Sequence, residues 1–445
     1  MAQGGGGDAT PVMVKRKGEK SGSKATKVPK KASLEAADGE LASDDEDSDI
    51  EPAKEAVEEE DGFFETPDEK RIRLAKEYLE RLEEAKPGQV QETLVEDVKE
   101  KTKRATAKVL ELSLGEPRYF KGHLMAPTSL CMRADEAEIF TGGKDCGLLR
   151  WDVETGKKIV VHPGGKNRFE CGGHFASVNG VAWVEQKQLL LSGGMDRVLR
   201  VWDVRLPPKS ACVDALLGHE GPINAVVVDP VGDRAYTVSA DKTLKMWDIR
   251  RRRIMDTLMG HVGQATCLDI YSESRPVSGG VDKTVRLWKV AQDTHLIFSR
   301  HTYPVDAVVS MDFSTCISGS QDGSLMLWTQ TSKKPLAKAQ LDKDQWVTAL
   351  GCIRASNVSF SGSSTGELRP WQSERGEDTP VRLVPAGKTM SLPGCINAIA
   401  VGQRYVACAV GKEQKLGRWH TDRGYRNGLV LIPLSYKTET LNEQL

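Results

Sequence analysis

A histidine, a hydroxyl residue, an aspartate and a tryptophan recur in this order along the chain. The two clearest sets are His174, Ser192, Asp196 and Trp202, followed by His219, Thr237, Asp241 and Trp247. Histidine and aspartate beside a hydroxyl are residue types that serve catalysis and metal binding. Repetition of one set at a constant spacing instead favours a structural unit, so we expect these histidines to be structural.

The repeat extends well beyond these two sets. Seven tryptophans recur at spacings of 51, 45, 41, 40, 43 and 48 residues: Trp151, Trp202, Trp247, Trp288, Trp328, Trp371 and Trp419. An aspartate stands six residues before each of the first five, and a hydroxyl residue ten before each of the first six. A period near 40–45 residues predicts stacked supersecondary units.

Two segments carry a family resemblance. The lines "LSGGMDRVLRVWDVR" and "TVSADKTLKMWDIR" are similar to the signature of WD40-repeat proteins, over roughly residues 118–432. The resemblance implies an all-β fold, a seven-bladed WD40 β-propeller over residues 113–435, with a tail at 436–445. It also implies that the repeated histidine, aspartate, hydroxyl and tryptophan form a buried network in each blade, which must be fully paired.

The pattern of apolar and turn residues predicts short β-strands within each repeat. Ile223–Val228, Arg234–Val238 and Thr243–Trp247 are β-patterned runs separated by turn residues. Closing a ring of seven units removes long exposed edges. Two segments compete for the closing position, one near Arg118–Lys121 and the other at Leu429–Pro433, and the sequence leaves both open.

The last two units depart from the pattern. The sixth has Thr365 in place of the aspartate and no Gly-His pair, and the seventh has Glu413 and Ala409 in place of the aspartate and the hydroxyl. We expect the network to be absent from both, while Trp346 and Ile396 still mark their inner strands.

The N-terminal quarter is of a different composition. Residues 1–112 hold 20 basic against 28 acidic residues, and residues 113–445 hold 42 against 35. Residues 1–61 are poor in apolar residues and predict a disordered tail. Basic clusters at 15–17 and 27–31 indicate a nuclear localisation signal, and the acidic tract Ser43–Glu51 is a candidate for phosphorylation.

Residues 62–112 predict a helical extension. "FFETPDEKRIRLAKEYLERLEE" begins at Phe63 and contains a capping box, and a second helical run is expected from Thr93 to about Leu112. The candidate partner-binding residues are Phe63, Phe64, Ile72, Leu79 and Leu82. The apolar face can dock on the propeller itself or on another protein, and we favour another protein.

This extension sharpens the resemblance. The blocks "ETPDEKRIRLAKEYLE", "GGKDCGLLRWD" and "FECGGHFASVNGVAW" are similar to the WD-repeat family specific to the U3 small nucleolar ribonucleoprotein (snoRNP), from Asp61 onward. The resemblance implies a non-catalytic scaffold that binds the box B/C region of U3 small nucleolar RNA (snoRNA) with box C/D core proteins. It also implies a place in the nucleolar small-subunit processome and in pre-rRNA processing toward 18S rRNA.

RNA contacts are expected at clusters of basic residues. The densest is Arg250, Arg251, Arg252 and Arg253, in the loop after a tryptophan strand. The further candidates are Lys166, Arg168, Lys157 and Lys158, and also Lys333 and Lys334. Arginine pairs with phosphates and stacks on bases, although ordinary surface arginines have the same appearance in a sequence.

A second function remains open. Trp202–Arg205 and Trp247–Arg250 both read W-D-x-R, which resembles the motif by which some WD40 proteins dock as substrate receptors on cullin-RING ubiquitin ligases. No phosphate loop, nucleophile elbow or metal-ligand spacing occurs, so we predict no enzyme, cofactor or metal. Nine single cysteines indicate reduced thiols, and no apolar run is long enough for a membrane span.

Overall fold

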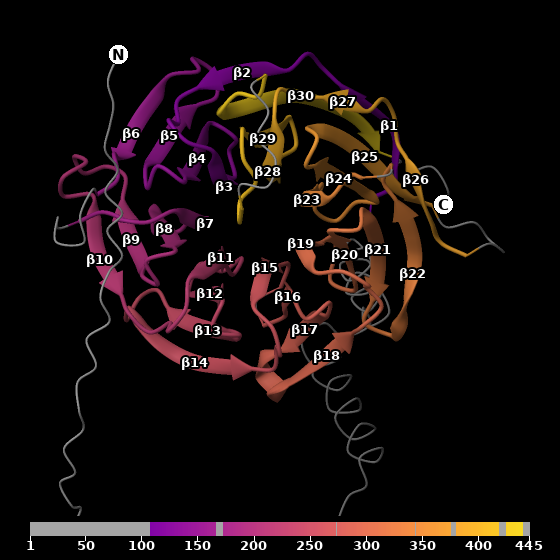
Figure 1. Ribbon diagram of the computed structural model, residues 1–445, viewed down its shortest axis with the longest axis horizontal. Coiled ribbons are helices and arrows are strands. Elements are labelled where there is room, and N and C mark those ends of the chain that lie inside the picture. Colours follow the sequence, from indigo (N-terminus) through magenta and orange to yellow (C-terminus); the bar gives the residue numbers. More distant parts are fainter. Residues whose placement is uncertain are drawn as a thin grey trace, which may run out of the picture. The chain divides into compact units, whose positions relative to one another are not determined.

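The computed structural model describes residues 107–165, 172–272, 274–342, 344–374, 380–417 and 424–438. Over these ranges the chain forms seven antiparallel sheets arranged in a ring (Figure 1). The predicted seven-bladed propeller is therefore confirmed. The helices predicted before residue 107 and the tail at 1–61, with Phe63, Phe64, Ile72, Leu79 and Leu82, lie outside the described residues.

Blades one to three each contain four strands in sequence order, from the innermost to the outermost. Blade one is β3 (Pro127–Met132), β4 (Glu138–Gly143), β5 (Leu148–Asp152) and β6 (Lys158–His162). Blade two is β7 (Val178–Val184), β8 (Leu189–Gly194), β9 (Leu199–Asp203) and β10 (Cys212–Leu216). Blade three is β11 (Ile223–Val228), β12 (Arg234–Ser239), β13 (Thr243–Asp248) and β14 (Arg253–Met259). The three strands predicted in this blade are correct to within one residue.

Blades four to six follow the same plan. Blade four is β15 (Ala265–Ile270), β16 (Pro276–Gly280), β17 (Val285–Lys289) and β18 (Thr294–Phe298), with the short 3-10 helix η1 (Val290–Gln292). Blade five is β19 (Val305–Ser310), β20 (Thr315–Ser320), β21 (Ser324–Thr329) and β22 (Ser332–Gln340). Blade six is β23 (Val347–Cys352), β24 (Val358–Ser363), β25 (Glu367–Glu374) and an outer strand divided into β26 (Arg382–Pro385) and β27 (Met390–Ser391).

Blade seven closes the ring with strands from both ends of the described chain. Its inner strands are β28 (Cys395–Val401), β29 (Tyr405–Gly411) and β30 (Gly428–Thr438), and its outer edge is β1 (Val109–Leu114) and β2 (Arg118–Lys121). Phe120 pairs with Leu429, and Leu114 pairs with Leu434 (Figure 1). Both segments that competed for the closing position therefore take part, β30 as the third strand and β2 as the fourth.

Two predictions about this blade are wrong. Residues 109–112, predicted as the end of a helix, belong instead to β1, whose backbone pairs with β30 more than 300 residues later in the chain. The tryptophan spacing predicts a third strand that ends near Trp419, which lies outside the described residues, whereas the strand paired with β29 is β30. Leu431 of β30 pairs with Ala407, as Trp151 pairs with Ile139 in blade one, so Leu431 takes the tryptophan position.

The hydrophobic core is divided into seven clusters, one between each pair of neighbouring blades. Trp202, for example, is fully buried against Phe140 and Leu148 of blade one, and Trp247 is buried against blade two. A single sheet cannot bury both of its faces, so each blade depends on its two neighbours. The ring therefore acts as one folding unit.

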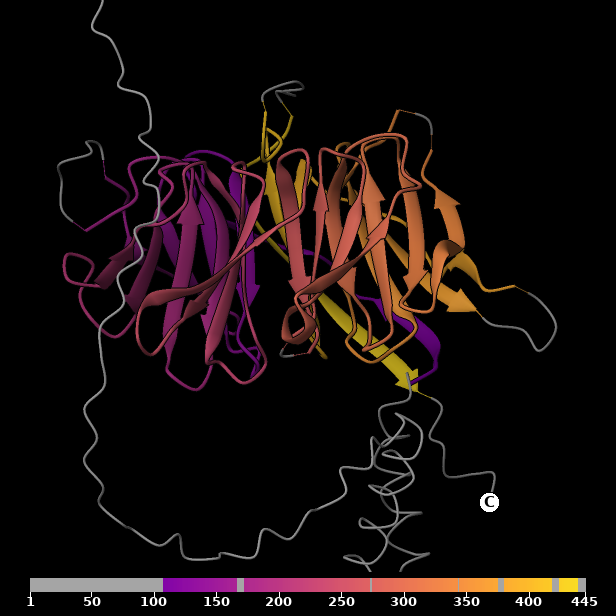
Figure 2. The same cartoon turned by 90° about the horizontal axis from the view of Figure 1, so that it is seen from below.

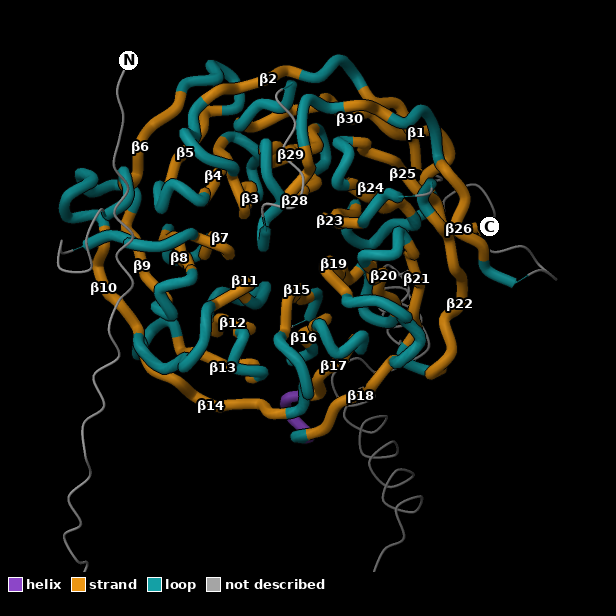
Figure 3. Tube along the Cα trace, in the orientation of Figure 1, coloured by secondary structure: helices purple, strands orange, loops and turns teal. Residues whose placement is uncertain are grey.

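The strand directions define two faces. Each innermost strand begins at one end of the ring, here called the upper face, and runs to the lower face (Figure 2). The antiparallel order then places the turns between second and third strands at the upper face, and the turns between third and fourth strands at the lower face. Figure 3 shows these strands and the loops that join them around the ring. Residues far apart in the sequence are brought together on these faces.

A ring of polar side chains links the innermost strands near the upper face. In six blades a threonine or asparagine donates a hydrogen bond to a carbonyl of the next blade: Thr128, Asn179, Asn224, Thr266, Thr348 and Asn397. Asn224 Nδ2, for instance, lies 2.7 Å from the Ala265 carbonyl, and Asn397 Nδ2 lies 2.9 Å from that of Pro127. Blade five has Asp306 at this position, and an ionised carboxylate cannot donate.

Candidate functional site

The repeated histidine, aspartate, hydroxyl and tryptophan meet in blades one to four. In blade two, His174 Nδ1 lies 2.8 Å from Asp196, and its Nε2 lies 2.6 Å from Ser192 Oγ, to which Trp202 Nε1 also donates at 2.7 Å. In blade three, the distances from His219 to Asp241 and to Thr237 are both 2.7 Å, and Trp247 donates to Thr237 at 2.8 Å. Four side chains, from two strands, the turn between them and the loop before the blade, are thus held together by hydrogen bonds.

The hydrogen-bond order assigns the protons. Because an ionised aspartate can only accept, Nδ1–H of the histidine donates to it, and Nε2 of the neutral ring then accepts the proton of the hydroxyl, which itself accepts from the tryptophan. Burial lowers the pKa of His174 and of His219, which keeps both rings neutral. Burial alone would raise the pKa of Asp241, but hydrogen bonds from Thr243 and His219 lower it to about 2. Both ring nitrogens are occupied and buried, so this arrangement holds a hairpin turn in place.

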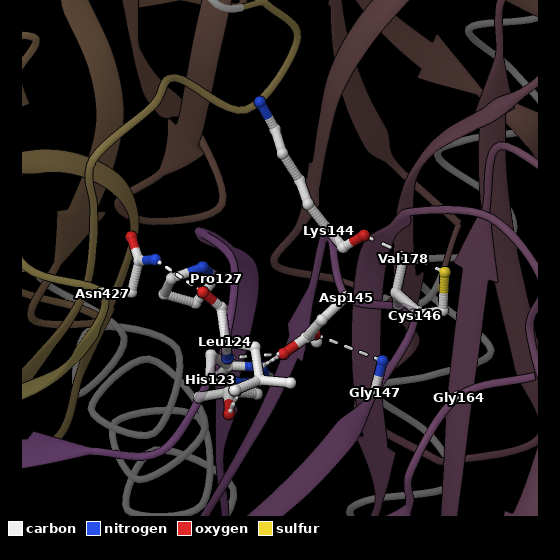
Figure 4. A network of polar contacts seen from close by, with 12 residues as sticks. His123, Leu124, Pro127, Lys144, Asp145, Cys146, Gly147, Gly164, Val178 and Asn427 are labelled. Atoms are coloured by element: carbon white, nitrogen blue, oxygen red, sulfur yellow. Dashed lines mark hydrogen bonds and ion pairs between the residues drawn. The ribbon is translucent and has the colours of Figure 1, made fainter. Parts of the chain in front are cut away.

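The same network in blade one also holds the chain at the entrance to the ring. Asp145 accepts from the backbone amides of Leu124 and Gly147 as well as from His123 (Figure 4). Asn427, from the loop before β30, donates to the Leu124 carbonyl (Figure 4). The network therefore joins the first blade to the last.

Blades five and six keep parts of the network. In blade five, His301 and Trp328 both bind Ser318 at 2.7 Å, but Asp322 accepts from Thr302 instead of from the histidine. In blade six, Trp371 still donates to Ser361 at 2.8 Å. The expectation that blade six lacks the network is therefore wrong for the contact between the hydroxyl and the tryptophan. These two residues lie in one hairpin, so their hydrogen bond forms without a histidine in the preceding loop.

Two of the predicted basic clusters lie on the lower face. Arg250, Arg251 and Arg252 form the turn between β13 and β14, Arg253 begins β14, and all four side chains are exposed. Lys157 and Lys158 occupy the equivalent turn of blade one and are also exposed. The turn of blade two between them carries exposed Arg205 and Lys209. We call this row, residues 157–158, 205–209 and 250–253, the lower arc.

Carboxylates neutralise part of the lower arc. Arg205 forms two hydrogen bonds with Asp203, at 2.8 and 2.6 Å. Arg251 lies 3.8 Å from Asp248, and Arg252 lies 3.5 Å from Asp214. Within the described part of the chain, Arg250 and Arg253 have no carboxylate at ion-pair distance. Exposed pairs of this kind contribute little to stability, and a phosphate can replace them.

The predicted cations Lys166 and Arg168 lie outside the described residues. Of the predicted cations, the structure describes Arg250–Arg253, Lys157, Lys158, Lys333 and Lys334, all on the lower face. It also places exposed Arg197, Lys242 and Lys283 on the upper face, which sequence reasoning missed although each directly follows a network aspartate.

The axis of the ring contains a cavity of about 630 Å³ that is lined toward the lower face by Glu185, Asp229 and Asp269. Arg354 also lines this cavity. It donates hydrogen bonds of 2.7 and 2.9 Å to Asp269 and one of 2.7 Å to the Ser310 carbonyl. Arg354 thus neutralises Asp269, and Arg133 lies 3.3 Å from Glu185, so these two arginines are already paired, and the exposed cations of the arc are the better lower-face candidates.

Neither a metal site nor a membrane span is evident in the described part of the chain. Its histidines, cysteines and acids form no group of three that could hold a metal ion. No helix there is long and apolar enough to cross a membrane.

Comparisons with known proteins agree with this geometry. The family model "WD domain, G-beta repeat" matches residues 165–203, 210–248, 252–289 and 293–329. The mouse "U3 small nucleolar RNA-interacting protein 2" is 30% identical, over 83% of this chain and 82% of its own length. The chain belongs to the WD40-repeat family of U3 snoRNP-associated proteins.

Further relatives of this WD40 protein are similar over most of their length. The Arabidopsis thaliana "U3 snoRNP-associated protein-like EMB2271" is 28% identical, over 88% of this chain and 91% of its own. The solved "Structure of U3-55K" superposes with a TM-score of 0.66 at 26% identity, covering 72% of this chain and 98% of the other.

The family matches also show how this WD40 ring is built. Each matched repeat from residue 210 onward begins with the outer strand of one blade and continues with the three inner strands of the next: β10 to β13, β14 to β17 and β18 to β21. Each sequence repeat is therefore shifted by one strand relative to the blades. Because of this shift, the first repeat supplies the outer strand of the last blade. That strand is β2, whose hydrogen bonds to β30 close the ring.

Proposed function

We propose that this protein is a non-catalytic scaffold of the U3 snoRNP. It binds the box B/C region of U3 snoRNA together with box C/D core proteins, within the small-subunit processome of the nucleolus. There it supports pre-rRNA processing toward 18S rRNA. The observation that carries the proposal is similarity over more than four fifths of the chain to a protein named as interacting with U3 snoRNA. The geometry agrees, since the repeated histidines are buried in structural networks and the cations are exposed.

The lower arc is the proposed RNA contact. Its turns stand side by side on blades one to three, so a strand of RNA can follow them from one blade to the next. Arg250 and Arg253 need not give up an ion pair to bind a phosphate, and the pairs of Arg251 and Arg252 are long and exposed. Lys157 and Lys158 extend the same arc by one contact site on blade one. Such contacts add affinity for phosphate rather than for a particular base.

The test is charge reversal across the arc. The variant R250E/R251E/R252E/R253E should weaken binding of U3 box B/C RNA by at least about tenfold at 0.1 M salt, and should lower the slope of log affinity against log salt by roughly three to four. K157E/K158E should have a smaller effect in the same direction. Its matched control is K333E/K334E, at the equivalent turn of blade five and two blades from the arc. Unchanged affinity and salt slope in the Arg250–Arg253 variant would refute the arc as the RNA contact.

Docking on a cullin-RING ubiquitin ligase through the two W-D-x-R motifs is the alternative. In one motif Arg205 is held by Asp203 of the same motif, and in the other Arg250 is exposed. Purification of the protein under mild conditions separates the two functions. Co-purification of U3 snoRNA and box C/D core proteins supports the scaffold, whereas a ligase adaptor without them supports the alternative.

A further inference from the structure

Three successive blades present a cation at one equivalent position of the upper face. Arg197, Lys242 and Lys283 directly follow the network aspartates of blades two, three and four, with φ of 67°, 71° and 64°. Blades five and six have Gly323 and Gly366 there, with φ of 76° and 88°. A side chain in this left-handed conformation costs roughly 1–2 kcal/mol relative to the ordinary regions. Blade one has Cys146 at this position with φ of 61°, so the turn forms without a cation, and the three cations are not required by it.

These cations are not neutralised by the aspartates beside them. Asp241 accepts from His219 and Thr243, and Asp282 accepts from His261 and Thr284, so both carboxylates face the turn rather than solvent. In the described ranges no carboxylate lies at ion-pair distance from the three cationic side chains, all of which are exposed. The upper face of blades two to four thus has unpaired positive charge.

Exposed aliphatic side chains lie beside the cations. Met195 and Val281 directly precede two of the network aspartates and are 53% and 42% exposed, and Val262, next to His261, is 74% exposed. The large apolar residues with the greatest exposure in the described chain all lie at this face: Leu124, Leu217, Met259 and Val262. Exposed apolar residues that share one face of a domain are typical of a protein-binding surface.

The axis itself is not part of this surface. The segment after β29 is anchored over blade one by Lys144, whose Nζ contacts Glu413 at 3.2 Å and the Gly417 carbonyl at 2.9 Å. It carries Lys415 close enough to Asp306 for their charges to act on each other's pKa. The accessible part is therefore the off-axis sector over blades two to four.

From this charge and these apolar residues we infer that the sector binds an acidic protein segment with interspersed aliphatic or aromatic residues. Carboxylates pair with Arg197, Lys242 and Lys283, while apolar residues cover Met195 and Val262. An RNA strand would leave the aliphatic residues without stacking partners, since bases stack on aromatic rings. The inference rests on the proposed function in one respect: RNA on the lower arc leaves the upper face free for protein.

A synthetic peptide tests this sector with the full-length protein. The probe is a labelled peptide of about twenty residues in which Asp and Glu alternate with Leu and Phe, measured by fluorescence anisotropy. R197N/K242N/K283N should weaken binding at least about tenfold, the loss expected for several charge pairs. Asparagine tolerates the left-handed turn, so this variant keeps its fold. V262S should also weaken binding, as should replacing either the acids or the apolar residues of the probe.

A lower-face variant separates this inference from the proposed RNA site. R250N/R251N/R253N removes the same number of charges from the lower arc, and should weaken U3 RNA binding while leaving peptide affinity within about twofold. Failure of the wild-type protein to bind the peptide, or equal binding by R197N/K242N/K283N, would overturn the inference. So would loss of RNA affinity in that variant, since the upper face would then be the RNA surface. Unchanged RNA affinity in the lower-arc variant would count against the arc alone.

Discussion

Asp306 interrupts the ring of interblade hydrogen bonds, and Asp306→Asn should repair it. Asp306 Oδ2 accepts from Gln321 Nε2 at 2.9 Å, whereas its Oδ1 is buried with no hydrogen-bond partner in the described structure. The other six blades have a donor at this position, and the corresponding acceptor here is the carbonyl of Val347. An asparagine at 306 can accept from Gln321 and also donate to that carbonyl, as Asn224 does toward Ala265.

The size of the effect follows from the pKa. Burial raises the pKa of Asp306 from 3.8 to about 6, while Gln321 and the charge of Lys415 act in the opposite direction. A change of about two pKa units corresponds to roughly 3 kcal/mol between the protonation states. Asp306 is partly open to the axis, so we expect about 1–3 kcal/mol of destabilisation when it is ionised, and roughly 1 kcal/mol more from the missing hydrogen bond.

The sign of the pH dependence is fixed by the direction of that shift. Between pH 3.8 and about 6 the folded state binds more protons at this site than the unfolded state, so its contribution to stability falls as the pH rises. Above that window the carboxylate is ionised in both states and the loss is complete. Asp306→Asn should therefore raise the free energy of unfolding at pH 7.5, and change it little at pH 4, where the protonated carboxyl can itself donate.

Urea denaturation followed by tryptophan fluorescence at pH 4 and pH 7.5 measures both quantities. Asp306→Ala is the matched control, because it removes the charge without adding a donor, and it should recover only part of the gain. The reasoning would be refuted if Asp306→Asn unfolded at the same urea concentration as the wild type at pH 7.5. It would also be refuted by an equal gain at the two pH values, since the carboxylate charge would then play no part.

Three further outcomes are expected. Thr237→Val should lower the free energy of unfolding by about 2–4 kcal/mol in urea denaturation, because Trp247 and His219 both lose a buried partner, while Thr237→Ser should be close to wild type. Removal of residues 1–121 should lower the melting temperature and promote aggregation in light scattering, because it exposes the edge of β30, whereas removal of residues 1–106 should leave the melting temperature nearly unchanged. Burial lowers the pKa of His301 from 6.5 to about 4, so the unfolded state binds more protons between these values. Its contribution to stability is lost as the pH falls through that window, and His301→Gln should flatten this part of a stability profile.

The blade networks could be predicted from the sequence because they are mostly local. Ser192 and Trp202 lie ten residues apart on the two strands of one hairpin, so turn length and strand register set their contact. Asp196 lies in the turn of that hairpin, and His174 lies in the loop before the same blade. A constant spacing in the sequence thus becomes a constant geometry in each blade. In blade six Thr365 replaces the aspartate, so the aspartate contact is lost, whereas Ser361 and Trp371 keep their spacing of ten residues and stay bonded.

Closure of the ring and the distribution of charge were decided by tertiary structure. Residues 109–112 follow a charged, alanine-containing run that favours a helix, but Val109, Glu111 and Ser113 alternate with leucines, and pairing with β30 selects the strand. The two closing segments cannot be ranked from the sequence, because they contact each other only after the six blades that lie between them in the chain have formed the ring. Likewise, Lys157 and Arg250 lie on the lower face, and Arg197 lies on the upper face. The first two follow the third strand of a blade and the last follows the second strand, and these two strands run in opposite directions. The sequence by itself determined the repeat and its buried contacts. The surfaces depend on closing the ring, because only then do residues from separate repeats become neighbours.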